Sequence, residues 1–393
     1  MTNSQFTPQQ RHLSLAAVIA GALGVGVGIG ALIPLIGLRL EAQGVDKWLI
    51  GLTAGMVPLA ILLVGPVVPR LISRLGTMPS LIAGMILFDG TVLLFPLLDW
   101  LAVWMVLRFL SGIAVAVHWV VTETWMNLMA TDRNRGRVMA IYVTAMSTGF
   151  ACGPLVIAET GIAGIRPFVI VALAMGLSMI PILLARKVAP PMPRHDGGGL
   201  WFTLRMAPAI MLTAFFGGMM DLAVINMLPL YGLALGVEER TAGYLLTAFI
   251  AGNVALQIPI GWLADRLGKF RTMLVCTGGS LAGAALLPVV GGAGPLLWTL
   301  LFLWGGVLFA IYTVALGLLG DRFPPAHLAA ANTVFVMMYN IGSFSGPVIA
   351  GAAMDLWSRD GMAATIGTAA ALLFAVTLWR GNRDAQRLRA SLP

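Results

Sequence analysis

The sequence predicts an all-α membrane protein in which twelve transmembrane helices form two pseudo-symmetric six-helix bundles. Three observations predict this fold class. Only 10% of the 393 residues are charged and 59% are hydrophobic, whereas a soluble globular chain carries about 25% charged residues. The apolar residues gather in long stretches, and segments of the first half recur in the second. Lipid is therefore expected to be the solvent for most of the chain.

Each long apolar stretch is predicted to be one helix that crosses the membrane. A crossing takes about 20 apolar residues. The stretches are continuously apolar and lack the polar alternation of barrel strands, so helices are favoured over a β-barrel. The twelve expected spans cover residues 13–38, 48–68, 79–98, 101–129, 138–158, 167–185, 209–235, 241–260, 273–291, 295–319, 328–353 and 362–379.

An internal repeat divides these spans into two homologous halves. Three segments recur in the same order at offsets of 195, 192 and 193 residues. The matched pairs are Pro34–Leu38 with Pro229–Leu233, Arg74–Gly76 with Arg266–Gly268, and Gly149–Pro154 with Gly342–Pro347. In so apolar a chain, paired halves suggest a transporter that rocks about a site between them.

The domain boundaries follow from the repeat and from one polar segment. Residues 186–205 form the longest internal polar stretch and contain several prolines and three consecutive glycines. Such a composition is typical of a flexible linker. We therefore expect an N-terminal bundle over residues 1–185, a cytoplasmic linker over 186–205 and a C-terminal bundle over 206–393.

The orientation follows from the distribution of Lys and Arg between the loops. With the N-terminus inside, the cytoplasmic segments hold 18 of the 24 basic residues and the outer segments hold 5. This excess predicts a multi-pass protein of the cell inner membrane with both termini cytoplasmic. It also explains the net charge of +8, which indicates contact with anionic lipid and gives no reason to expect nucleic acid.

Several classes of chemistry lack a signature in the sequence. No nucleotide-binding loop, metal-ligand cluster or serine nucleophile elbow is present, so we expect no enzyme, no metal and no cofactor. The two cysteines, Cys152 and Cys276, fall in predicted spans without metal-ligand spacing. Each is interpreted as a structural thiol.

One loop carries a specific motif. Gly261–Arg271 reads GWLADRLGKFR and resembles the cytoplasmic loop signature of the major facilitator superfamily. The resemblance implies a latch that closes the inward side, with gating roles for Asp265 and Arg266. In physical terms, Asp265 would pair with Arg135 and Arg137 at the basic start of the fifth span and face that helix's positive end. The corresponding first-half loop has Ser73 in place of the acid.

Further motifs extend the resemblance over almost the whole chain. Arg108–Gly112 in the fourth span is similar to the superfamily's R-x-x-x-G motif. Together with the stretch from His118 to Arg137 and the segment Ile258–Gly261, it looks like the YcaD-like branch of the superfamily. The resemblance implies the twelve-span major facilitator fold and proton-coupled transport of a small solute, and it does not imply a particular substrate.

The repeated G-x-x-x-G-P motif is interpreted as a helix-contact element. Proline kinks a helix, and glycine beside it allows close backbone approach. We expect the fifth and eleventh spans to form symmetric parts of the contact between the halves. On the fifth span the motif resembles the superfamily's antiporter motif, although Leu155–Ile157 replace its trailing glycines. The motif residues are Gly149, Gly153, Pro154, Gly342, Gly346 and Pro347.

Ionisable side chains inside spans are the main functional candidates, because they are costly in lipid and usually face a cavity. The superfamily fold implies that the first, fourth, seventh and tenth spans line a central cavity. This places Asp221 on the seventh span and Arg108, His118 and Glu123 on the fourth at the cavity. Asp89, on the third span, would lie in the outer scaffold, where a structural role is favoured.

Helical geometry groups the fourth-span candidates. At about 100° per residue, Trp119, Thr122 and Glu123 lie within 60° of Arg108 on one face, and His118 lies on its flank. A cation, an indole, a hydroxyl and an acid suit a polar or amphipathic solute. We assign Arg108, His118, Trp119 and Asn226 to the substrate cavity. For His118, Trp119 and Asn226, a role in helix packing stays open.

Proton coupling is assigned to two acids. A buried carboxylate is disfavoured in its charged form, so Asp221 can load and release protons near physiological pH. Glu123, nearer the cytoplasmic end, is the second candidate. The sequence thus predicts a monomeric secondary transporter whose partners are a small-molecule substrate, protons and membrane lipid. Export by proton antiport is favoured slightly over uptake by symport. The alternative hypotheses are a lipid flippase and a non-transporting receptor on the same fold.

Overall fold

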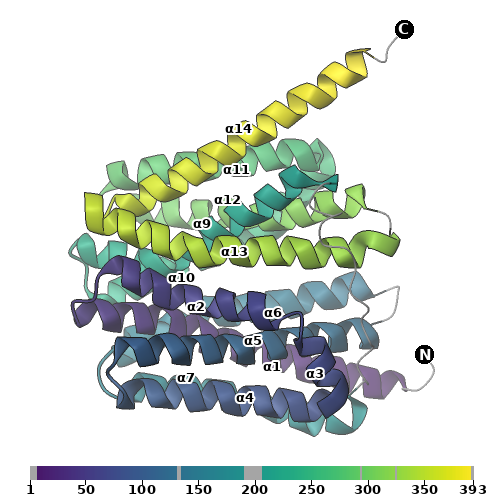
Figure 1. Ribbon diagram of the computed structural model, residues 1–393, viewed down its shortest axis with the longest axis vertical. Coiled ribbons are helices and arrows are strands. Elements are labelled where there is room, and N and C mark those ends of the chain that lie inside the picture. Colours follow the sequence, from purple (N-terminus) through teal and green to yellow (C-terminus); the bar gives the residue numbers. More distant parts are fainter. Residues whose placement is uncertain (1–6, 131–133, 190–205, 293, 324, 391–393) are drawn as a thin grey trace. The chain divides into compact units, whose positions relative to one another are not determined.

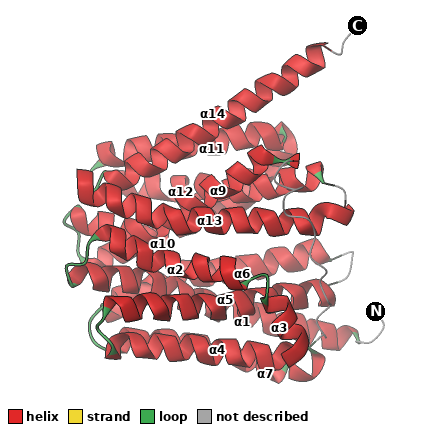
Figure 2. Cartoon of the chain, in the orientation of Figure 1, coloured by secondary structure: helices red, strands yellow, loops and turns green. Residues whose placement is uncertain are grey.

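The computed structural model describes residues 7–130, 134–189, 206–292, 294–323 and 325–390 (Figure 1). Within these ranges the chain is helical and contains no strand (Figure 2). Clustering of the backbone separates two compact units. Unit 1 comprises residues 1–43 and 56–196, and unit 2 comprises residues 44–55 and 197–393.

The helices of the first half are α1–α7, and those of the second half are α9–α14. In the first half they are α1 (Pro8–Ala42), α2 (Lys47–Val64), α3 (Val68–Leu75), α4 (Thr77–Leu94), α5 (Leu101–Met129), α6 (Arg135–Thr160) and α7 (Arg166–Leu184), with short 3-10 turns at Phe95–Leu97 and Arg186–Val188. In the second half they are α9 (Pro208–Ala234), α10 (Glu239–Leu267), α11 (Lys269–Val290), α12 (Pro295–Arg322), α13 (Pro325–Trp357) and α14 (Gly361–Ala390).

Twelve of these helices are long and apolar enough to span a membrane. They confirm the twelve predicted spans and the all-α class. Two boundaries differ from the hydropathy pattern. The predicted span 241–260 belongs to α10, which continues to Leu267, and the first-half loop after Pro69 is largely the short helix α3. Both charged loop motifs are therefore helical, because α-helical hydrogen bonding continues beyond the point where apolarity ends.

The same packing pattern recurs in the two halves. Within unit 1, α1 packs on α6 and α7, and α4 packs on α5 and α7; within unit 2, α9 packs on α13 and α14, and α11 packs on α12 and α14. A glycine occupies the same turn in both halves. Gly76 joins α3 to α4 with φ 92°, and Gly268 joins α10 to α11 with φ 83°. Such angles favour glycine, so the repeated Arg-Leu-Gly motif encodes a one-residue turn.

The repeated glycine-proline motifs are helix-contact elements within each unit. A Cβ on Gly149 or Gly153 would overlap the backbone of α1, and a Cβ on Gly342 or Gly346 would overlap the backbone of α9. The nearest neighbours of these four glycines lie in their own unit, so the close crossings that they allow are within each half. The expected contact between the halves through the fifth and eleventh spans stays a prediction. Pro154 and Pro347 lie inside α6 and α13, beside these close crossings.

The first turn of α2 lies in unit 2 and is capped by a carboxylate there. Asp355, near the end of α13, accepts hydrogen bonds from the backbone N–H groups of Lys47 at 3.1 Å and Trp48 at 2.9 Å. These are two of the N–H groups that a helix leaves free at its start. The negative charge also matches the positive end of the helix dipole.

Candidate functional site

Helix α5 carries four predicted site residues, and it buries them unequally. Arg108 is 3% exposed and His118 is 6% exposed, whereas Trp119 is 42% exposed. Glu123 is half-buried. The predicted polar face of this helix therefore includes both a buried cation and an open indole.

Arg108 is a cation without a partner among the residues that the structure describes. Its Nε atom is buried without a hydrogen-bond partner, and its side chain forms no hydrogen bond or ion pair with any described residue. The nearby Ser111 hydroxyl donates 2.8 Å to the Arg108 backbone carbonyl and does not engage the guanidinium. Since buried polar groups are nearly always hydrogen-bonded, this side chain has binding capacity that the protein itself does not use.

Further along α5, two polar contacts form, and one side chain has no partner within the described part of the chain. The Trp119 indole N–H donates to the Glu123 carboxylate, and the Thr122 hydroxyl lies 2.9 Å from the Tyr142 hydroxyl of α6. Both ring nitrogens of His118 are buried without a partner. Glu123 and Trp119 thus form a local pair one turn apart, separate from Arg108.

Helix α9 positions Asp221 in the interior of unit 2. Its side chain is 1% exposed. The Tyr339 hydroxyl of α13 donates to Oδ2 at 2.9 Å, and Oδ1 is buried with no partner. No cation among the described residues pairs with it. One hydrogen bond offsets little of the cost of burying a carboxylate, so this environment favours the protonated group.

Asn226 does not share the face of Asp221. Five residues separate the two along α9, which corresponds to about 140° of rotation. The Asn226 amide donates 2.9 Å to the Leu222 carbonyl of its own helix, and the side chain is 5% exposed. The structure therefore brings Asp221 together with Tyr339 and not with Asn226.

The sequence analysis did not identify Tyr339, the partner of Asp221, or Tyr312, which contacts Tyr339. The Tyr312 ring of α12 contacts the Tyr339 ring edge-on, with centroids 5.0 Å apart. Two signals could have found them. A tyrosine hydroxyl inside an apolar span needs a hydrogen-bond partner, and the chain has only 5 tyrosines. The 193-residue repeat also pairs Tyr312 with Trp119, a residue that was assigned to the cavity.

The predicted gating residues lie at helix ends. Asp265 and Arg266 are exposed near the end of α10, and the Arg266 guanidinium stacks on the Trp262 ring at 3.7 Å. Arg137 is exposed in the first turn of α6, and the side chain of Arg135 lies outside the described residues. Because the acid and its two expected partners belong to different units, their pairing stays a prediction.

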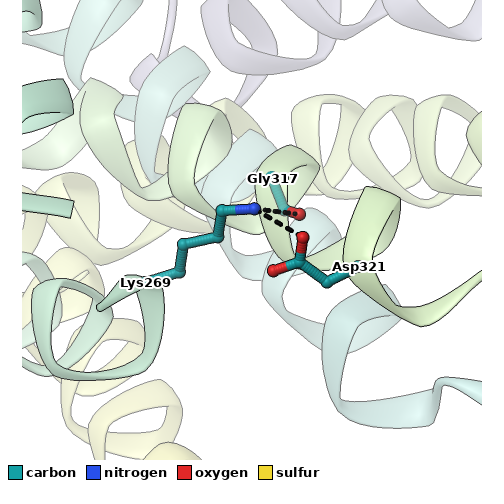
Figure 3. Close-up of polar contacts among 3 residues, drawn as sticks. All are labelled: Lys269, Gly317 and Asp321. Atoms are coloured by element: carbon teal, nitrogen blue, oxygen red, sulfur yellow. Dashed lines mark hydrogen bonds and ion pairs between the residues drawn. The ribbon is translucent and has the colours of Figure 1, made fainter. Parts of the chain in front are cut away.

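The turn after the second-half motif is held by an ion pair. Lys269, the first residue of α11, donates 2.7 Å to the Asp321 carboxylate and 3.1 Å to the Gly317 carbonyl, both on α12 (Figure 3). The repeat places Thr77 opposite Lys269. Asp321 also lines a pocket of about 420 Å³ within unit 2. None of the predicted substrate residues lines that pocket.

Asp89 lies on α4 with one carboxylate oxygen buried and unpartnered. Its other oxygen faces Gly176 of α7, a helix of the same unit. The cysteines Cys152 and Cys276 are free thiols. Within the described ranges, no three His, Cys, Asp or Glu side chains gather as a metal site would require.

Comparison with known proteins shows which family this chain belongs to. The sequence model of the Major Facilitator Superfamily matches residues 17–313 and 210–391. The MFS-type transporter YfkF of Bacillus subtilis (strain 168) is 26% identical over 340 residues, which cover 83% of this chain and 85% of the relative. The MFS-type transporter YcaD of Escherichia fergusonii is 24% identical over 347 residues, which cover 87% of this chain and 89% of the relative.

Solved structures of similar fold are also transporters. A mutant of the nucleoside transporter NupG superposes with a TM-score of 0.80 at 14% identity, covering 93% of this chain and 99% of the other. A bacterial homologue of the human lysosomal transporter Spinster, inward-facing and unoccupied, superposes with a TM-score of 0.74 at 13% identity, covering 95% and 98%. At these identities the likeness is one of fold.

Proposed function

Because the chain belongs to the YcaD-like branch of the Major Facilitator Superfamily and is therefore a multi-pass membrane transporter and not an enzyme, we propose that it couples the movement of a small organic solute to protons. The two bundles would alternate the access of a solute site between the two sides of the inner membrane. Asp221 would carry the proton, and Glu123 would assist its release.

The state of Asp221 is the observation that carries this proposal. The carboxyl group is 1% exposed, has a single hydrogen bond to Tyr339, and lacks a cationic partner among the described residues. Protonation removes the cost of a buried charge, whereas deprotonation restores it. A group whose energy changes so strongly with its proton can bias one orientation of a transporter over the other.

Two observations bear on the direction of transport. Gly149, Gly153 and Pro154 form part of an antiporter-type motif, which supports export in exchange for protons. Leu155–Ile157 replace the glycines that would complete it, which supports proton-symport uptake as the second candidate. The direction in which protons move when solute enters distinguishes antiport from symport.

The proposal is tested with purified protein in liposomes that contain a pH-sensitive dye. A panel of small organic acids, amides and amines is added outside, and the internal pH is followed. We expect at least one compound to drive proton movement in the wild type and the response to disappear in Asp221→Asn, which keeps the shape of the side chain but cannot ionise. Solute flux that persists with unchanged proton movement in this variant would overturn the assignment.

Asp89→Asn is the matched control, because it makes the same chemical change at an acid on α4 that faces Gly176. This variant should retain coupling. Equal losses in both variants would indicate damage to the fold instead of a specific role for Asp221. Binding of a panel compound with no flux at all would favour a receptor, and movement of labelled phospholipid in the same liposomes would favour a flippase.

A further inference from the structure

The guanidinium of Arg108 is the one Lys or Arg side chain in the described residues that is fully buried. It is 3% exposed, and every other Lys or Arg whose side chain the structure describes is more exposed to solvent. Its Nε has no acceptor, and no described residue pairs with the group. A buried cation without an acceptor is costly, since it loses its hydration and receives nothing in return.

Other cations of the chain show how the protein normally satisfies such groups. Arg39 donates to the backbone carbonyls of Ile162 at 3.2 Å and Gly164 at 2.8 Å. Lys269 pairs with Asp321. Both cations lie near helix ends, and both are paired. The absence of an acceptor at Arg108 is therefore a property of that position and not of cations in this fold.

The acids inside the spans of unit 1 do not supply the missing partner. Glu123 lies fifteen residues further along α5, which is about 22 Å at helical rise, and it accepts from Trp119. Asp89 is on α4 and faces Gly176 of α7. His118 is about 15 Å from Arg108 along the helix and is rotated by about 80°, so it does not share the same ligand.

We infer that the transported solute carries an anionic carboxylate group and that Arg108 binds it. The inference rests on the proposed transport function and names the class of its substrate. The planar guanidinium presents paired N–H donors that match the two oxygens of such a group. A bound anion would supply the acceptors and the opposite charge that the empty protein lacks.

The first test needs no knowledge of the solute. If Arg108 serves the ligand, removing its charge relieves a cost in the empty protein. Purified Arg108→Gln without ligand should then unfold at the same temperature as the wild type or higher. A fall of several degrees would show that the arginine stabilises the empty protein, and it would overturn the inference. The functional cost of Arg108→Gln would appear only when ligand is present.

The second test measures binding with matched compounds. Thermal unfolding is followed with sets of a carboxylate, its neutral amide and the corresponding amine at constant ionic strength, beginning with benzoate, benzamide and benzylamine and extending to larger sets. At least one carboxylate should stabilise the wild type more than its amide and amine. In Arg108→Gln its affinity should fall about 30-fold or more, as expected for the loss of a buried charge pair.

Two controls define the result. Arg186→Gln removes the same charge at an exposed position of the same unit and should leave the affinity unchanged, whereas Arg108→Lys should retain part of it. Chloride and phosphate are tested alone. Stabilisation by these ions without any organic anion would overturn the inference, because it would assign Arg108 to an inorganic anion. Preference for amides or amines, or no response to any carboxylate, would overturn it too.

Failure of this inference can be told apart from failure of the transport proposal. A neutral or cationic compound that moves with protons in the liposome assay would refute the anionic substrate and leave proton-coupled transport intact. A carboxylate that binds through Arg108 without any flux would refute transport instead.

Discussion

At the residue scale, the Tyr339 hydroxyl donates a hydrogen bond to the buried carboxyl group of Asp221 within unit 2. The hydroxyl is the single donor that the described residues give this carboxyl group, while Oδ1 has none. A donor that stays in place while the proton comes and goes stabilises the ionised form more than the protonated one. The tyrosine is therefore placed to set how readily Asp221 gives up its proton.

We expect Tyr339→Phe to fold and to lose about tenfold or more in solute-driven proton movement, because a hydrogen bond to a charged group contributes about 1.5–3 kcal/mol. The measurement is the initial rate of internal pH change in the liposome assay. Tyr231→Phe is the matched control. It deletes the hydroxyl of another buried tyrosine, which donates 3.3 Å to the Leu287 carbonyl, and it should lower stability while keeping the rate. Equal rates in Tyr339→Phe and wild type would contradict the role.

The sequence identified the interior ionisable residues but not their partners. Asp221 and Arg108 stand out because charge is rare inside apolar stretches, and both are buried. Tyr339 lies 118 residues from Asp221, and nothing local in either stretch links the two. The same limit applies to Arg108, since the absence of an acceptor becomes visible only after the neighbouring helices have packed.

At the scale of elements, the glycines of α6 and α13 determine which helices pack closely. Gly153 allows α6 to cross α1 so closely that a Cβ would overlap the Gly30 backbone. The same device recurs where Gly346 meets Met219 of α9. Since backbone atoms cannot rotate away as a side chain can, each crossing tolerates only glycine.

We expect Gly153→Ala to lower the free energy of unfolding by about 1–3 kcal/mol or more, as overpacking does in a close-packed interior. Thermal unfolding of the purified variant measures the effect. Gly90→Ala on α4 is the control, because a Cβ there has nothing within 4 Å. Alanine also favours a helix over glycine by up to about 1 kcal/mol, so that variant should be neutral or stabilised. Similar losses in both would contradict the close-crossing explanation.

The sequence predicted that these glycines make helix contacts but not which helices they meet. The spacing G-x-x-x-G gives one small-residue face per helix, and that face is all the sequence contains. Whether it packs on a helix of the same unit or of the other depends on the folded arrangement. The ends of α10 show a similar limit, because hydropathy falls at Gly261 while the helix continues to Leu267.

The duplication sets the architecture at the scale of the whole molecule. Thr77 begins α4 and Lys269 begins α11, which repeats the offset of 192 residues seen in the motifs. The twelve spans and the two sets of helices could be predicted because lipid requires long apolar segments and because the repeat is preserved in sequence. The twelve candidate spans of the described residues also predict that both termini lie on one side of the membrane.

The uneven distribution of Lys and Arg predicts which side this is. We expect a fluorescent protein fused to the C-terminus to fluoresce in cells and alkaline phosphatase at the same position to be inactive, because both report a cytoplasmic location. Phosphatase fused within the α9–α10 connection, after Gly236, should be active. An active phosphatase at the C-terminus would contradict the predicted orientation.

The single-glycine turns at Gly76 and Gly268 have a practical consequence for following motion in this protein. A probe on α10 and a second on α11 lie on helices of one unit that are joined by a single residue, so their spacing should change less than that of probes on different units. Such a pair provides an internal ruler for pulsed magnetic-resonance measurements. Any distance that changes between probes elsewhere can then be read against a standard carried by the same chain.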